Sequence, residues 1–88
     1  MDHDTAVDVQ HQPDRSRFVA EVEGRTAFLS YERGQGSVAL QHTIVPPELE
    51  GRGIAGRLAA AAVGWARTEG LDVDPQCSYV RSWLSRHG

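Results

Sequence analysis

Two side chains of this sequence are suited to proton transfer or nucleophilic attack, those of His42 and Cys77. An imidazole has an ordinary pKa of about 6.5, so His42 is suited to accept a proton from an amine near neutral pH. The thiol of Cys77 is suited to protonate a leaving group or, when a histidine activates it, to accept an acyl group. A strand histidine and a lone cysteine are each more often structural, so their chemistry depends on what the fold places between them.

A glycine-rich segment between these two residues, 51–57, has the composition of a phosphate-binding turn. It leads from an apolar strand into an alanine-rich helix, whose first N–H groups lack intrahelical partners and lie at the positive end of the helix dipole. Its glycines let a diphosphate approach the backbone, and its arginines match phosphate geometry. It lacks the Gly-Lys-Ser/Thr ending of a P-loop. The residues predicted to form this cradle are Gly51, Arg52, Gly53, Ile54, Ala55, Gly56 and Arg57.

Alternating apolar and polar residues predict four strands in the first half of the chain. Short turns join them at Gln12–Arg15, Glu23–Arg25 and Arg33–Gly36. Successive strands with such short connections form an antiparallel meander, which excludes the parallel dinucleotide-binding fold. The predicted strands are Ala6–Gln10, Phe18–Val22, Thr26–Glu32 and Ser37–Val45.

Apolar residues at three- and four-residue spacing predict an amphipathic helix from Arg52 to Glu69, with Gly70 as its C-terminal cap. A short strand at Leu71–Val73 follows, and a crossover connection makes it parallel to the fourth strand. A final helix is predicted at Tyr79–Arg86. Its buried residues are predicted to be Val80, Trp83 and Leu84.

The same patterns predict which side chains are buried. In the fourth strand, alternation assigns one face of the sheet to Val38, Leu40 and His42 and the other to Ala39, Gln41 and Thr43. Core positions are predicted for Phe18, Phe28, Trp65, Trp83 and Tyr79. The remaining histidines lie near the ends or in a turn without metal-ligand spacing, so they are predicted to be solvated and no metal site is expected. These are His3, His11 and His87.

Length and composition place the chain among small globular proteins. With 88 residues it has room for one domain, predicted at residues 5–88 after a frayed segment at residues 1–4. The net charge is −3 and no basic run occurs, which argues against nucleic acid as a partner. No apolar run reaches a membrane span of roughly 18 residues, no secretory pattern opens the chain, and a single cysteine fits a reducing compartment. A cytoplasmic protein without a membrane partner is therefore expected.

The order of these elements and three separated motifs resemble the GNAT acetyltransferase superfamily. The diphosphate motif of that superfamily has Gln or Arg, two residues, Gly, one residue, and Gly or Ala, which matches residues 50–55 with Glu50 at the first position. The segments His42–Pro46 and Val73–Val80 resemble the short, single-domain branch of the superfamily. The resemblance implies an α+β fold of order β-β-β-β-α-β-α with a mixed, mainly antiparallel sheet.

The resemblance also implies acetyl-CoA as cosubstrate. The backbone around Ile44 and Val45 would hold the thioester carbonyl and the pantetheine arm, and residues 51–57 would hold the diphosphate. His42 and Cys77 would then flank the thioester and catalyse transfer to a small-molecule or protein amine, by a ternary complex or through an acetylated cysteine. An alternative is a CoA-binding or regulatory module with little or no transferase activity, which the acidic Glu50 favours.

Overall fold

The structure, a computed structural model, describes residues 8–87 of the chain. The segment predicted to be frayed, residues 1–4, lies outside this range. So do residues 6 and 7 of the predicted strand Ala6–Gln10, and the described part of the chain is a strand only from Val9 onward. Among the described residues, the short 3-10 helices η2 (Pro13–Arg15) and η3 (Pro47–Leu49) lie in connections between the main elements. The strands and helices are β1 (Val9–Gln12), β2 (Arg17–Val22), β3 (Arg25–Arg33), β4 (Ser37–Ile44), α1 (Ile54–Thr68), β5 (Asp72–Pro75) and α2 (Ser78–His87).

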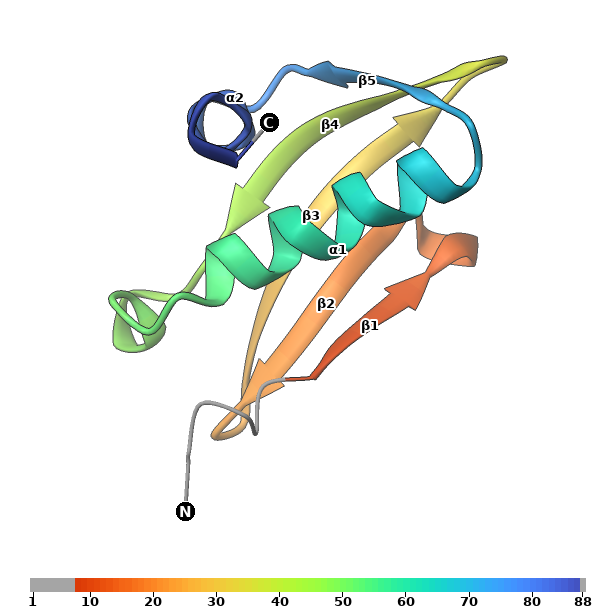
Figure 1. The fold of residues 1–88 in the computed structure, drawn as a ribbon. Coiled ribbons are helices and arrows are strands. Elements are labelled where there is room, and N and C mark those ends of the chain that lie inside the picture. Colours follow the sequence, from red (N-terminus) through yellow and green to blue (C-terminus); the bar gives the residue numbers. More distant parts are fainter. Residues whose placement is uncertain (1–7, 88) are drawn as a thin grey trace.

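The five strands form one sheet in chain order, β1-β2-β3-β4-β5 (Figure 1). The first three pairings are antiparallel, and β5 pairs with β4 in parallel after the crossover through α1. The predicted antiparallel meander, the parallel last strand and the α+β fold class are therefore confirmed. The last strand lies at Asp72–Pro75, slightly later in the chain than the predicted Leu71–Val73.

Left-handed glycines fix both ends of α1. Gly53 precedes the helix with φ of +77°, so the helix begins at Ile54 and not at the predicted Arg52. At the other end, Gly70 has φ of +72°, its N–H bonds to the carbonyl of Arg67, and the next N–H bonds to the carbonyl of Ala66. This is a Schellman motif, which confirms Gly70 as the residue that terminates the helix.

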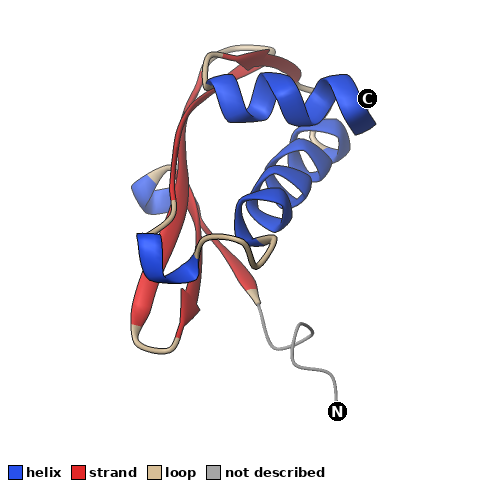
Figure 2. Ribbon diagram, turned by 90° about the vertical axis from the view of Figure 1, so that its left-hand side faces the viewer, coloured by secondary structure: helices blue, strands red, loops and turns tan. Residues whose placement is uncertain are grey.

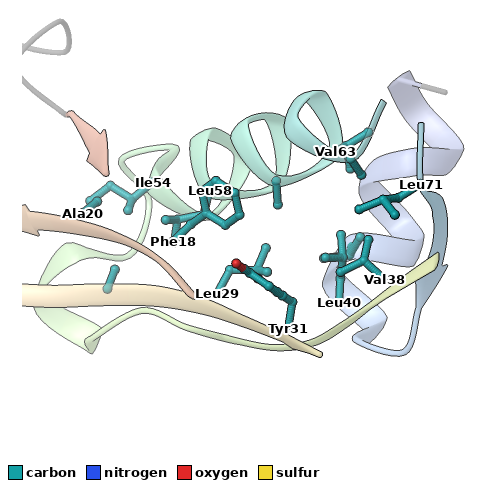
Figure 3. Packing of buried hydrophobic residues seen from close by; sticks show 14 of the residues in the cluster. Phe18, Ala20, Leu29, Tyr31, Val38, Leu40, Ile54, Leu58, Val63 and Leu71 are labelled. Carbon is teal, nitrogen blue, oxygen red and sulfur yellow. The ribbon is translucent and has the colours of Figure 1, made fainter. Parts of the chain in front are cut away.

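Both helices lie on one face of the sheet, and no α-helix covers the opposite face within residues 8–87 (Figure 2). The core fills the space between α1 and the sheet (Figure 3). Trp65, Trp83 and Leu84 pack against this core and are half-buried. Its fully buried side chains include Leu29, Leu40, Leu49, Ile54, Leu58, Val38, Val63 and Val80.

A β-bulge in β4 changes the face of every residue after it. Tyr31 pairs with Leu40 but the preceding Ser30 pairs with His42, so Gln41 is an extra residue in β4. Thr43 consequently lies opposite the buried Leu29 on the helix-covered face. The predicted placement of His42 beside Leu40 is wrong, because the bulge turns the exposed His42 to the uncovered face.

Two aromatic predictions are also corrected. Phe28 pairs with Val19 and Ile44 on the uncovered face and is half-buried, so it is not part of the core cluster. His11 is not solvated, because its ring stacks on Phe18 at a centroid distance of 4.2 Å and its Nε2 lies 2.7 Å from the hydroxyl of Tyr31. The edge strand β1 is therefore held to the sheet by an aromatic contact that the sequence pattern did not indicate.

Candidate functional site

The site begins where β5 separates from β4. Their parallel pairing ends at Leu40, whose carbonyl accepts hydrogen bonds from the N–H groups of both Gln76 and Cys77, each at 3.0 Å. The bulge at Gln41 lies next to this point. Beyond it β4 continues to Ile44 paired with β3 alone, so the β5 side of its backbone is released from the sheet ladder.

A cavity of about 220 Å³ lies beyond the end of β4, at the N-terminal end of α1. It joins the last residues of the β4 segment to the glycine-rich turn and to the first turn of α2. Most of the predicted cradle lines it, whereas the side chains of Arg52, Arg57 and Ile44 do not. The lining residues are Val45, Leu49, Glu50, Gly51, Gly53, Ile54, Ala55, Gly56 and Tyr79.

The helix end at this cavity has backbone donors that no group of the helix satisfies. Gly53 has no side chain to cap the helix, and the first intrahelical bond runs from the N–H of Arg57 to the carbonyl of Gly53. The N–H groups of Ile54, Ala55 and Gly56 therefore have no acceptor within the helix. All three residues line the cavity, so these donors and the positive end of the helix dipole are available to an anion there.

The glycines of the turn are needed for two different physical reasons. Gly51 and Gly53 have φ of +84° and +77°, which L-residues with a side chain rarely adopt. Gly56 is helical, but a Cβ there would come within 3.3 Å of the hydroxyl of Tyr79. Gly56 thus allows α2 to approach α1. The close approach brings the half-buried Tyr79 to the wall of the cavity, which differs from its predicted position in the core.

Arg52 is engaged by a different part of the fold. Its guanidinium makes two hydrogen bonds to the carboxylate of Glu23, at 3.0 and 3.3 Å. Glu23 and Gly24 form the tight turn between β2 and β3 with φ of 55° and 77°. The hydrogen bonds from Arg52 lower the pKa of the Glu23 carboxyl below its ordinary value.

Cys77 lies immediately before α2, and its carbonyl accepts the N–H of Arg81. Its half-buried sulfur lies 3.3 Å from the hydroxyl of Thr43. Burial raises the pKa of the thiol, but hydrogen bonds from Thr43 and from the backbone of Val80 and Tyr79 outweigh it and leave the pKa below its ordinary value. The site therefore stabilises the thiolate form of Cys77 relative to that of an ordinary cysteine.

The structure brings both predicted catalytic residues to the point where the strands separate, but on opposite faces of β4. Thr43, which the sequence analysis did not single out, is the side-chain hydrogen-bond partner of the Cys77 sulfur. His42 is exposed on the uncovered face, where Ile44 is also 51% exposed. The covalent alternative, in which His42 activates Cys77, therefore lacks a direct hydrogen bond between the two side chains, because the sulfur is paired with Thr43. The bulge that separates them has no signal in a simple alternating pattern.

Two further observations concern other kinds of site. Among residues 8–87, no group of three or more histidine, cysteine and acidic side chains is placed to hold a metal ion. None of the helices described by the structure is long and apolar enough to cross a membrane.

Comparison with known proteins agrees with the architecture. A family model described as GCN5-related N-acetyl-transferase matches residues 17–88. The chain is 36% identical to Protein NATD1 of Xenopus tropicalis over 90 residues, covering 99% of this chain and 83% of that protein. It is 37% identical to Protein NATD1 of Homo sapiens over 82 residues, covering 90% of this chain and 73% of that protein. With the sheet, the crossover helix and its uncapped N-terminus, these matches show that the chain belongs to the GCN5-related N-acetyltransferase family.

Proposed function

We propose that this protein binds acetyl-CoA and transfers its acetyl group to an amine. The observation that carries the proposal is the cavity at the uncapped N-terminus of α1, which Val45 lines just after β4 and Tyr79 lines from the first turn of α2. Family membership supports the same cosubstrate. In this arrangement the N–H groups of Ile54, Ala55 and Gly56 bind the diphosphate. The pantetheine arm runs along Ile44 and Val45, where β4 lacks a β5 partner.

The reaction needs a deprotonated amine, a held thioester and a proton for the departing sulfur. In a direct route, the amine nitrogen bonds to the acetyl carbon, the carbon–sulfur bond breaks, His42 takes the amine proton, and the Cys77 thiol protonates the CoA thiolate. The placement of His42 and Cys77 on opposite faces suits these two separate proton transfers. The acceptor amine then arrives from the uncovered face, where His42 lies. Glu32 of β3 and Asp74 of β5 are exposed, both pair with Ala39 of β4, and their carboxylates suit a cationic amine.

A covalent route uses the same groups in another order. The Cys77 thiolate attacks the acetyl carbon, CoA leaves, and the amine then takes the acetyl group from the sulfur with His42 accepting its proton. The lowered pKa of Cys77 and its position before α2 support this route without a Cys–His contact. Intact mass after incubation with acetyl-CoA separates the routes, since only the covalent route adds one acetyl group to Cys77 before any amine is present.

Activity is tested by release of CoA from acetyl-CoA in the presence of a panel of amines and lysine peptides, with the acetylated product identified by mass. We expect turnover that falls at least tenfold in Cys77→Ala and in His42→Ala, and that persists in the control His87→Ala, a histidine at the far end of α2. Turnover unchanged in both site variants contradicts the assigned residues. Binding of CoA without turnover on any amine identifies the binding or regulatory module, which the acidic Glu50 in the cavity favours.

A further inference from the structure

We infer that Arg52 is a positioning residue of the cradle, clamped by the β2–β3 turn, and not a ligand of the phosphates. This inference rests on the proposed binding of CoA at the cradle. It assigns a function to Glu23, which lies 29 residues away in sequence from Arg52 and belongs to no part of the diphosphate motif.

Two ion pairs of opposite polarity join the β2–β3 turn to the loop before α1. Glu23 of the turn binds Arg52 of the loop through both carboxylate oxygens. Arg25, the first residue of β3 after the turn, lies 3.4 Å from the carboxylate of Glu48 in the loop. A two-bond arginine–carboxylate pair fixes orientation as well as distance, and the second pair adds a separate point of contact between the hairpin and the loop. The turn therefore holds the loop at two points, one on each side of Gly51.

The loop needs such a constraint because of its composition. Arg52 stands between Gly51 and Gly53, both in left-handed conformations, and glycines have the largest conformational freedom to lose. Both glycines line the cavity, whereas the Arg52 side chain does not. The guanidinium thus points toward the hairpin while the neighbouring backbone faces the ligand. Held in this way, the loop presents the first N–H groups of α1 in one arrangement.

These pairs are exposed to solvent, so their contribution to global stability is small. Instead, these pairs are expected to order residues 48–53 locally and thereby to raise the affinity for CoA. Freeing the loop adds an ordering cost on binding, which corresponds to about a three- to tenfold weaker Kd for CoA. Global unfolding should change little, which separates a local clamp from a folding defect.

Charge reversal tests the inference with the full chain. Glu23→Arg and Arg52→Glu are each expected to weaken the Kd for CoA measured by calorimetry, and the double variant Glu23→Arg/Arg52→Glu is expected to recover to within about twofold of the wild type. If Arg52 instead bound the phosphates directly, the double variant would still have glutamate at position 52. Its Kd for CoA would then stay as weak as that of Arg52→Glu. The control Arg67→Glu makes the same charge change in the last turn of α1 and is expected to leave the Kd unchanged.

A second measurement needs no ligand. In the free protein, amide hydrogen exchange of Leu49 and Glu50, whose N–H groups bond to the carbonyls of Pro46 and Pro47, is expected to accelerate in each single reversal and to return to the wild-type rate in the double variant. Exchange that is unaffected by the single reversals overturns the clamp. Absence of CoA binding by the wild type, in contrast, removes the proposed function, and the exchange data then still decide whether the hairpin orders the loop.

Discussion

The left-handed cap of α1 makes a quantitative prediction for Gly53→Ala. A residue with a Cβ in the left-handed region costs about 1–2 kcal/mol, and alanine returns about 0.4–1 kcal/mol by restricting the unfolded chain. No atom lies within 4 Å of a Cβ built on Gly53, so sterics add nothing to this backbone cost. The net expectation is a loss of about 1 kcal/mol in the free energy of unfolding, which lowers Tm by about 4–8 °C in a domain of this size.

The matched control is Gly64→Ala in the middle of the same helix. Gly64 has an ordinary helical conformation, and nothing lies within 4 Å of an added Cβ. This substitution is expected to stabilise the protein by about 0.5–1 kcal/mol. Both variants are followed by thermal unfolding with circular dichroism, backed by urea unfolding. A Gly53→Ala protein as stable as the wild type, or shifted in the same direction as Gly64→Ala, refutes the left-handed cap on which the cradle geometry depends.

Three further outcomes are expected. The rate of Cys77 alkylation by iodoacetamide should rise with pH around a midpoint below that of an unfolded cysteine, and Thr43→Val should raise this midpoint; a midpoint that does not move excludes the Thr43 contact. Burial lowers the pKa of His11 from 6.5, so its share of stability is complete above pH 6.5 and declines as the pH falls below that value. The urea midpoint should therefore fall more between pH 7.5 and 5.5 in the wild type than in His11→Phe, and equal falls would show that His11 is not buried neutral. Leu58→Ala, which empties a fully buried site, should cost about 2–5 kcal/mol by the same unfolding assay, and a cost below about 1 kcal/mol would contradict the packing of α1 on the sheet.

The elements of the fold were largely predictable from the sequence because they depend on local patterns. Apolar periodicity located α1, and Gly70 marked its end through a conformation that glycine favours. The first residue of α1 was misplaced because Gly53, and not Arg52, takes the capping conformation. Local rules describe a residue and its neighbours along the chain, so they perform well where the determining contacts are also local.

The errors at the site have a common physical cause, which is pairing between segments far apart in the chain. The bulge at Gln41 is defined only by the register between β3 and β4, and it exchanges the faces of His42 and Thr43. The partner of Arg52 comes from another hairpin, and the burial of His11 depends on aromatic rings from three other elements. Composition located the glycine-rich turn that lines the cavity, whereas the direction of its side chains required the tertiary structure.

The central claim is that the uncapped N-terminus of α1 and the free edge of β4 form a CoA site. Titration of isotope-labelled protein with CoA, followed through its amide NMR signals, tests this most directly. We expect saturable shifts that are largest at the amides of residues 54–56 and 43–45. Shifts confined to other regions, such as the uncovered face around Val19, or no shifts with millimolar CoA, would contradict it.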